Sequence, residues 1–103
     1  MINRNDIARA MTALSHPRRV AIFEALETAG PAGLGFEALL ERTRLQPSTL
    51  RHHLRPMMSA RLVTSSRRGL NVFYSLHGAE VLGVTAGVNA RLSAVITPSI
   101  AAE

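Results

Sequence analysis

The sequence predicts one mainly helical domain with a small β-hairpin, in the order four helices, hairpin, helix. Apolar residues recur every three or four positions in five segments, which is typical of helices that bury one side. Two short runs rich in β-branched and aromatic residues follow the fourth segment and are separated by Arg67-Arg68-Gly69-Leu70. A chain of 103 residues, 47% of them hydrophobic, fits a single folded domain over residues 1–103.

The first three helices are each followed by a recognisable stop. The apolar face of the first consists of Ile7, Met11 and Leu14. We expect this helix to end near Ser15-His16, because Pro17 suits the first turn of a second helix, where its missing N–H would be unpaired in any case. Gly30-Pro31-Ala32-Gly33 stops the second helix, and a short third helix is predicted over residues 36–43.

The fourth helix, predicted from Pro47, has one apolar and one polar side. With side chains stepping about 100° per residue, the apolar side comprises Leu50, Leu54 and Met57, with His53 and Met58 at its margins. The polar side comprises Ser48, Arg51, His52 and Arg55. The apolar side can pack on the earlier helices and leave the polar side free, as in the recognition helix of a helix-turn-helix. We expect a kink or a restart at Pro56, because proline removes one helical hydrogen bond.

Residues 62–66 and 71–76 are predicted to pair as a hairpin. One face of the second strand consists of Val72, Tyr74 and Leu76. This alternation lets that face close the core while the tip, with Arg67 and Arg68, projects into solvent. A last helix is predicted from Ala79 to about Thr97, with Pro98 marking its end.

The distribution of charge points to nucleic acid. Between Arg42 and Ala79 the chain carries seven arginines and no Asp or Glu, although it has seven acidic residues elsewhere and a formal net charge of +5. Each phosphate that a basic side chain neutralises releases counterions, so such a segment favours binding to duplex DNA. All twelve basic residues are arginine, which reflects either forked contacts to phosphate and guanine or the base composition of the genome.

We therefore predict DNA contacts from the fourth helix and the hairpin tip. The candidates are Gln46, Ser48, Thr49, Arg51, His52, Arg55, Arg67 and Arg68. Arg51 suits a forked contact to guanine, whereas Arg55 suits phosphate, which positions the protein without specifying sequence. Arg67 and Arg68 would reach the adjacent minor groove or its phosphates.

Plainer interpretations stay open for several of these residues. The polar side of the fourth helix and the hairpin tip could simply be solvated. Gln46 is equally plausible as an ordinary turn residue. At the start of the second helix, Arg18 and Arg19 are interpreted as structural ion-pair partners or surface charges.

The residue types and their spacing give little support for a metal site or for catalysis. The chain has no cysteine, which excludes disulfides and thiolate metal ligands. His52 and His53 are adjacent on one helix and so diverge, and His77 with Glu80 has no further ligand nearby. The chain also lacks a glycine-rich phosphate loop and a Ser-His-acid set. We predict no metal site, no cofactor and no enzymatic activity.

The apolar segment from Val81 to Ala102 raises the question of a membrane span. Asn89, Arg91 and Pro98 within it argue against one, because a central arginine is costly in lipid. The N-terminus leads into an amphipathic pattern rather than the apolar core of a signal peptide. We therefore expect a cytoplasmic protein without membrane contact.

Three pieces of sequence together resemble the ArsR/SmtB family of winged-helix repressors. They are Leu14–Arg19 at the start of the second helix, Gln46–Leu54 in the fourth, and Ala60–Val63 running through Arg67-Arg68-Gly69 to Val72–Leu76 in the hairpin. The resemblance implies a winged helix-turn-helix fold and repression of promoters by binding double-stranded DNA at an inverted-repeat operator until an inducer lowers affinity. It also implies a homodimer whose interface lies on the first and last helices, here through Ile7, Met11, Val84, Val88, Leu92 and Val95.

The sequence departs from this family at its usual sensor sites. Many relatives bind metal through cysteines on the third helix or through Asp, His and Glu on the last, and this chain has neither set. Pro56 is atypical, as is Arg61, which stands where relatives often carry glycine. Two alternatives to a plain repressor therefore remain: a winged-helix module that binds a partner protein, and a sensor that binds a metal or small molecule at another site.

Overall fold

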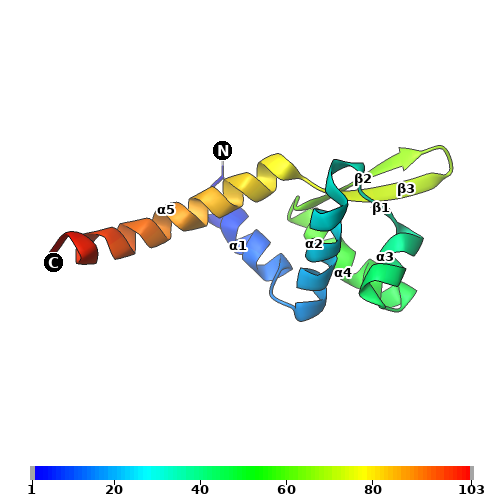
Figure 1. The fold of residues 1–103 in the computed structure, drawn as a ribbon, viewed down its shortest axis with the longest axis horizontal. Helices are drawn as coiled ribbons and strands as arrows, with labels where there is room; N and C mark the ends of the chain where they lie inside the picture. Colours follow the sequence, from blue (N-terminus) through cyan, green and yellow to red (C-terminus); the bar gives the residue numbers. More distant parts are fainter. Residues whose placement is uncertain (1, 103) are drawn as a thin grey trace.

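The predicted helices and the hairpin are all present in the computed structural model, which describes the backbone of residues 2–102 and the side chains of residues 2–93 and 95. The helices are α1 (Arg4–Ala13), α2 (Pro17–Ala29), α3 (Phe36–Thr43), α4 (Pro47–Ser59) and α5 (Gly78–Ala102), with a 3₁₀ helix η1 (Gly30–Ala32) after α2. The strands are β1 (Leu34–Gly35), β2 (Val63–Arg68) and β3 (Asn71–Leu76). The mainly α winged helix-turn-helix prediction is confirmed (Figure 1).

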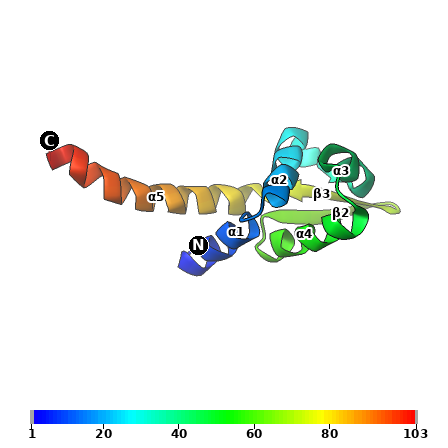
Figure 2. The same cartoon turned by 90° about the horizontal axis from the view of Figure 1, so that it is seen from below.

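The molecule has a body at one end and a helical arm at the other. Helices α2, α3 and α4 and the sheet form the body, while α5 leaves it with α1 alongside its first half (Figures 1 and 2). The hairpin of β2 and β3 points away from the end of α5, and the chain measures 57 × 24 × 23 Å. Viewed from below, α2 and α3 lie on one side of the body and α4 on the opposite side (Figure 2).

The core forms where α2, α3, α4 and β2 meet. Its largest fully buried side chains are Ile22, Leu26, Leu39, Leu50, Met57, Leu62 and Val63. The predicted apolar side of α4 is confirmed, because Leu50, Leu54 and Met57 are all buried. His53, which we expected at the margin, lies inside the core with 4% of its surface exposed.

The sheet has one strand more than predicted, in the order β1-β3-β2. The short strand β1 pairs antiparallel with β3, with Leu34 opposite Tyr74. Gly33, which precedes β1, has φ +73°, and a Cβ atom there would lie 2.3 Å from the carbonyl oxygen of Tyr74. Glycine is therefore required for this close approach.

The hairpin tip is shorter than predicted. Arg67 and Arg68 belong to β2, where they pair with Val72 and Asn71, so they do not form the loop. The turn is Gly69-Leu70, with Gly69 at φ +63°. Because both arginines are held in a ladder, the register decides which face of the sheet each one occupies.

The helices overturn one expectation based on proline and part of another. Helix α4 runs without a break through Pro56 to Ser59, so no restart occurs, and the expected kink stays a prediction. Buried residues on both sides of Pro56, Leu54 and Met57, hold the helix in place despite the missing hydrogen bond. Helix α5 likewise continues past Pro98 to Ala102. Proline removes one hydrogen bond and crowds the carbonyl of the preceding turn, but the residues after it keep their own N–H donors, so the helix can continue beyond it.

Two arginines adopt the left-handed backbone conformation. Arg44 has φ 58° where it caps the end of α3, and Arg61 has φ 65° between α4 and β2. Glycine adopts this conformation without the cost that a Cβ atom imposes. The backbone at Arg61 is thus in a conformation that suits glycine, the residue that members of the resembled family often carry at this position.

Glycines on α5 let α1 pack closely against it. A Cβ atom on Gly83 would lie 2.5 Å from Cγ1 of Ile2, and one on Gly87 would lie 3.0 Å from Cδ1 of Ile7. Val84 between them is buried, with 8% of its surface exposed. In the part of the chain that the structure describes, no helix is both long enough and apolar enough to cross a membrane.

Candidate nucleic-acid interface

The predicted polar side of α4 lies on the surface. Ser48, Arg51, His52 and Arg55 are exposed, and Thr49 is half-buried. Gln46, also exposed, is the N-cap residue of α4, but its side chain makes no capping hydrogen bond. All the predicted contact residues of this helix are therefore available to a ligand, and they divide between its two long edges.

One edge of α4 faces the sheet across a groove. This groove has a volume of about 370 Å³ and is lined by Arg51, Leu54, Arg55, Met58 and Tyr74. The guanidinium carbon of Arg51 lies 4.8 Å from the centre of the Phe36 ring at the start of α3. A cation above an aromatic face is attracted to it, so Phe36 helps to orient Arg51 without neutralising its charge.

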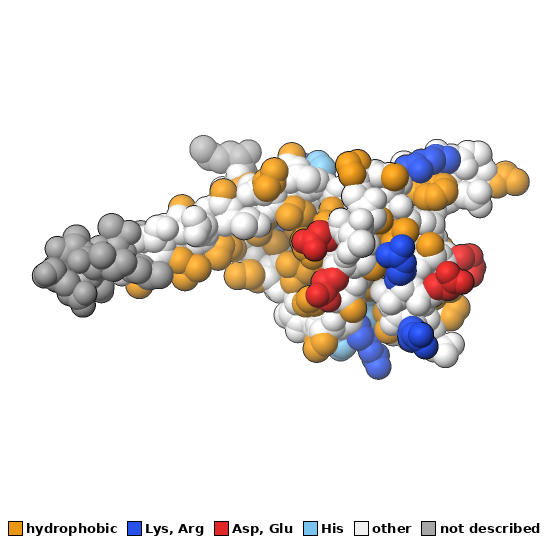
Figure 3. Space-filling view, viewed as in Figure 1, with side chains coloured by type: hydrophobic (Ala, Val, Ile, Leu, Met, Phe, Trp, Pro, Cys, Tyr) orange, Lys and Arg blue, Asp and Glu red, His pale blue; other side chains and the backbone are white. Residues whose placement is uncertain are grey.

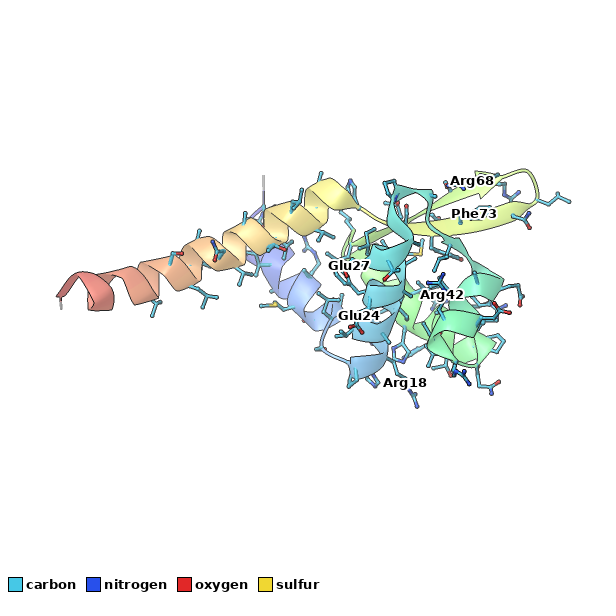
Figure 4. All side chains as sticks on the ribbon, in the orientation of Figure 1. Arg18, Glu24, Glu27, Arg42, Arg68 and Phe73 are labelled. Carbon is cyan, nitrogen blue, oxygen red and sulfur yellow. The ribbon has the colours of Figure 1, made fainter. Side chains whose placement is uncertain are left out.

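The register of the hairpin separates the two wing arginines. Arg67 stands opposite Val72 and so shares a face with Tyr74, two residues along β3, which lines the groove with Arg51 and Arg55. Arg68 lies on the other face. Its guanidinium carbon is 4.3 Å from the Phe73 ring centre, and its Nη2 donates to the carbonyl oxygen of Ala32 at 2.7 Å (Figure 4). From the sequence, we had predicted the same role for Arg67 and Arg68 at the hairpin tip.

The other edge of α4 faces the start of α2 across a second depression, which we call the basic cleft, with a volume of about 490 Å³. From the start of α2 it is lined by His16, Arg18 and Arg19. From α4 it is lined by Ser48, Thr49, His52 and His53. Guanidinium, imidazole and hydroxyl groups make up this lining, with no carboxylate among them.

Hydrogen bonds fix the floor of the basic cleft. Arg19 donates from Nε to Nδ1 of His53 at 3.1 Å and from Nη1 to the carbonyl oxygen of Thr12 at 3.3 Å. The backbone amide of Arg18 donates to Nδ1 of His16, which caps α2, at 3.1 Å. Arg19 is therefore structural as expected, but its partners are a histidine and a carbonyl, and among the described side chains no acid pairs with it.

Burial lowers the pKa of His53, and the nearby positive groups of His16, Arg19, His52 and Arg18 lower it further. Both causes favour the neutral imidazole. A neutral ring is also what the bond from Arg19 requires, because Nδ1 must accept it. Sequence reasoning missed this cluster since Arg19 and His53 are 34 residues apart and neither belongs to a recognisable local pattern.

Acidic side chains gather on the side of the body that lies opposite α4. Figure 3 shows acidic side chains on the face formed by α2 and α3, and Figure 4 places Glu24, Glu27 and Arg42 there. Helix α4 lies on the opposite side of the body (Figure 2). Arg42, which belongs to the acid-free segment, therefore lies on the same side of the body as Glu24 and Glu27 (Figure 4).

The histidines do not form a metal site in the described residues, where no three His, Asp or Glu side chains come close enough to hold an ion. The rings of His52 and His53 meet edge to face, with centres 5.3 Å apart. The two nitrogens that accept hydrogen bonds, Nδ1 of His16 and of His53, are already occupied by the protein.

Known proteins share the sequence pattern and the fold of this chain. A family model described as a helix-turn-helix domain matches residues 14–66. An ArsR-like transcriptional regulator from Rhodococcus sp. RHA1 is similar in structure, with a TM-score of 0.74 and 24% sequence identity over 95% of this chain and 89% of that one. The transcriptional repressor BigR from Xylella fastidiosa has a TM-score of 0.64 and 22% identity over 89% and 87% of the two chains.

A third similar structure is described as a homodimer. It is the winged helix-turn-helix DNA-binding domain, fragment 1–100, of Mb0332 from Mycobacterium bovis, a possible ArsR-family transcriptional regulator. It has a TM-score of 0.68 and 26% identity over 86% of this chain and 80% of that one. Comparison with curated protein sequences gives no match.

Proposed function

Because the chain belongs to the helix-turn-helix family whose model covers residues 14–66 and has the winged-helix fold of ArsR-type regulators, we propose that it is a sequence-specific, DNA-binding transcription repressor. The resemblance to the ArsR/SmtB family seen in the sequence is confirmed. The similar proteins are described as transcriptional regulators, which agrees with the prediction that the chain is not an enzyme.

The observation that carries the proposal is the position of three arginines on one side of the body. Arg51 and Arg55 line the groove beside α4, and Arg67 lies on the sheet face that closes this groove. A helix with its side chains is about 10–12 Å across, which matches a major groove about 12 Å wide. With α4 in the major groove, Arg67 would lie over the flanking backbone or minor groove.

Each predicted contact residue receives a role in this arrangement. Arg51 reads a guanine, Arg55 and Arg67 hold phosphates, and Gln46, Ser48, Thr49 and His52 contact base edges or phosphate from α4. Arg68 is reassigned, since its guanidinium is engaged by Phe73 and Ala32. We assign it to holding the wing against η1.

The arm supports a homodimer, as described for the Mycobacterium bovis domain. Met11, Leu92 and Val95 are 52%, 54% and 72% exposed, which leaves apolar side chains on α1 and α5 without cover in the described chain. Ile7 and Val88 are partly buried and could extend this surface. Val84 is removed from the predicted interface, because it is buried within its own chain. Such a dimer would act in the cytoplasm.

Selection of binding sites from random duplexes tests the proposal. We expect an inverted repeat whose half-sites are centred about 10 base pairs, or a multiple of this, apart, with two protomers bound per site. Equal affinity for selected and random duplexes at about 150 mM salt would leave only a non-specific DNA binder. Absence of salt-sensitive binding to any duplex would instead favour a winged-helix module that binds a partner protein.

A further inference from the structure

The basic cleft is only partly used by the proposed function, which gives no role in DNA binding to the residues that line it from α2. Its lining combines two arginines, three histidines and two hydroxyl groups from two separate helices, and no acidic side chain lies among them. Groups of this kind donate hydrogen bonds and carry positive charge, so they suit an anion with several acceptor oxygens. A cation is disfavoured there because Arg18 and Arg19 line the same cleft.

Two imidazole rings in the cleft are held as hydrogen-bond donors. Nδ1 of His53 accepts from Arg19, and Nδ1 of His16 accepts from the amide of Arg18. In a neutral ring the proton must then sit on Nε2. The ring centres are 4.7 Å apart, and neither Nε2 has a protein partner among the described residues. His53 as a whole is 4% exposed, but its Nε2 is not closed off from solvent, because no buried side-chain nitrogen or oxygen among the described residues lacks a partner. The unused Nε2 donor of His53, which lines the cleft, can therefore reach a ligand there.

The first turn of α4 adds further donors to the same place. Gln46 provides no side-chain cap, and Pro47, the first residue of the helix, has no amide hydrogen. The amides of Ser48 and Thr49 therefore have no helical partner at the end of a helix where the backbone dipole favours negative charge. Across the cleft, Arg18 is exposed at the start of α2 and extends away from the body (Figure 4).

We propose that the basic cleft binds one phosphate of the DNA backbone, with Arg18 as the charged contact and the Arg19–His53 pair as its fixed floor. The proposal rests on the proposed function, since the cleft shares Ser48, Thr49 and His52 with the surface predicted to read bases. A DNA strand that runs alongside α4 would bring one of its phosphates to the mouth of this open cleft. Arg18 is thereby reassigned from a surface charge to a DNA contact, while Arg19 keeps its structural role.

Replacing Arg18 by alanine tests this assignment, with Arg42→Ala as the matched control. Both arginines are exposed, but Arg42 lies on the side of the glutamates. Arg18→Ala should bind the selected operator and a random duplex equally about 10-fold more weakly than wild type. The slope of log affinity against log salt should fall by about 1, and Arg42→Ala should keep the wild-type slope. Wild-type affinity and slope in Arg18→Ala would overturn the proposal.

Two further measurements separate the possible sources of the effect. Arg18→Lys should recover most of the lost slope, because a lysine binds phosphate as a point charge. Inorganic phosphate titrated into the DNA-free protein at constant ionic strength should show no saturable binding. Saturable binding that Arg18→Ala loses, while Arg18→Ala keeps the wild-type affinity for the operator, would make a free phosphate the occupant and overturn the DNA assignment. If wild type bound no duplex, the proposed function itself would fail. If wild type bound duplexes and Arg18→Ala bound them equally well, only the assignment of the cleft to a DNA phosphate would fail.

Discussion

The two sides of the body differ in how they use the same residue type. On the side of α2 and α3, Arg42 lies on a surface that also carries Glu24 and Glu27 (Figures 3 and 4). On the side of α4, Arg51 and Arg55 line a groove without any acidic residue. Long-range attraction of a polyanion depends on where the net charge faces, so we expect DNA to bind on the α4 side.

The comparison also shows that an arginine-rich segment is not a uniform surface. Of its seven arginines, Arg51, Arg55 and Arg67 belong to the α4 side through the groove and the strand register. Arg44 and Arg61 are set by backbone geometry at the ends of α3 and α4. Of the remaining two, Arg68 lies over the Phe73 ring, and Arg42 lies on the side of the body that carries Glu24 and Glu27 (Figure 4). Charge along the sequence therefore overestimates the number of contacts to DNA.

The largest expected difference between the two sides is in base preference. Arg51→Ala should weaken binding to the selected operator by about 10- to 100-fold and relax the preference at one base position, because a forked contact to guanine contributes about 1–3 kcal/mol. Arg42→Ala on the opposite side should stay within about twofold of wild type. Fluorescence anisotropy with the operator and its single-base variants measures both. An equal loss on every duplex would make Arg51 a phosphate contact instead.

A smaller contrast is expected between the two arginines of the wing. Arg67→Ala should weaken binding to all sequences by several-fold and reduce the salt slope by about 1. Arg68→Ala should leave the slope unchanged but lower the free energy of unfolding by about 1 kcal/mol, since it loses a ring contact and one hydrogen bond. Salt titrations and urea unfolding of both variants distinguish these effects. A reduced slope in Arg68→Ala would return that residue to the DNA surface.

Periodicity explains how much of this arrangement the sequence could predict. The apolar spacing in α4 predicted which side chains would be buried, and it left Ser48, Arg51, His52 and Arg55 outside, as observed. Adjacent residues of a strand face opposite sides, so the separation of Arg67 from Arg68 follows once both belong to β2. Which of the two faces the groove depends on the register, which a one-residue change in the turn would reverse. The two-residue strand β1 is too short for a pattern, and the contact between Arg19 and His53 depends on how two helices pack.

The smallest expected effect concerns Arg44, which we assign to the fold and not to DNA. At φ 58°, the strain of a residue with a Cβ atom lowers the free energy of unfolding by about 1–2 kcal/mol. Glycine avoids this strain but lowers the free energy of unfolding by about 0.4–1 kcal/mol, because it gives the unfolded chain more freedom. Arg44→Gly should therefore raise the free energy of unfolding by about 0.5–1 kcal/mol and leave operator affinity within about twofold. The same change at Arg42, inside the last turn of α3, should lower it by about 1 kcal/mol. Urea unfolding at equal protein concentration compares the two, and a marked loss of operator affinity in Arg44→Gly would place Arg44 among the contacts of the α4 side.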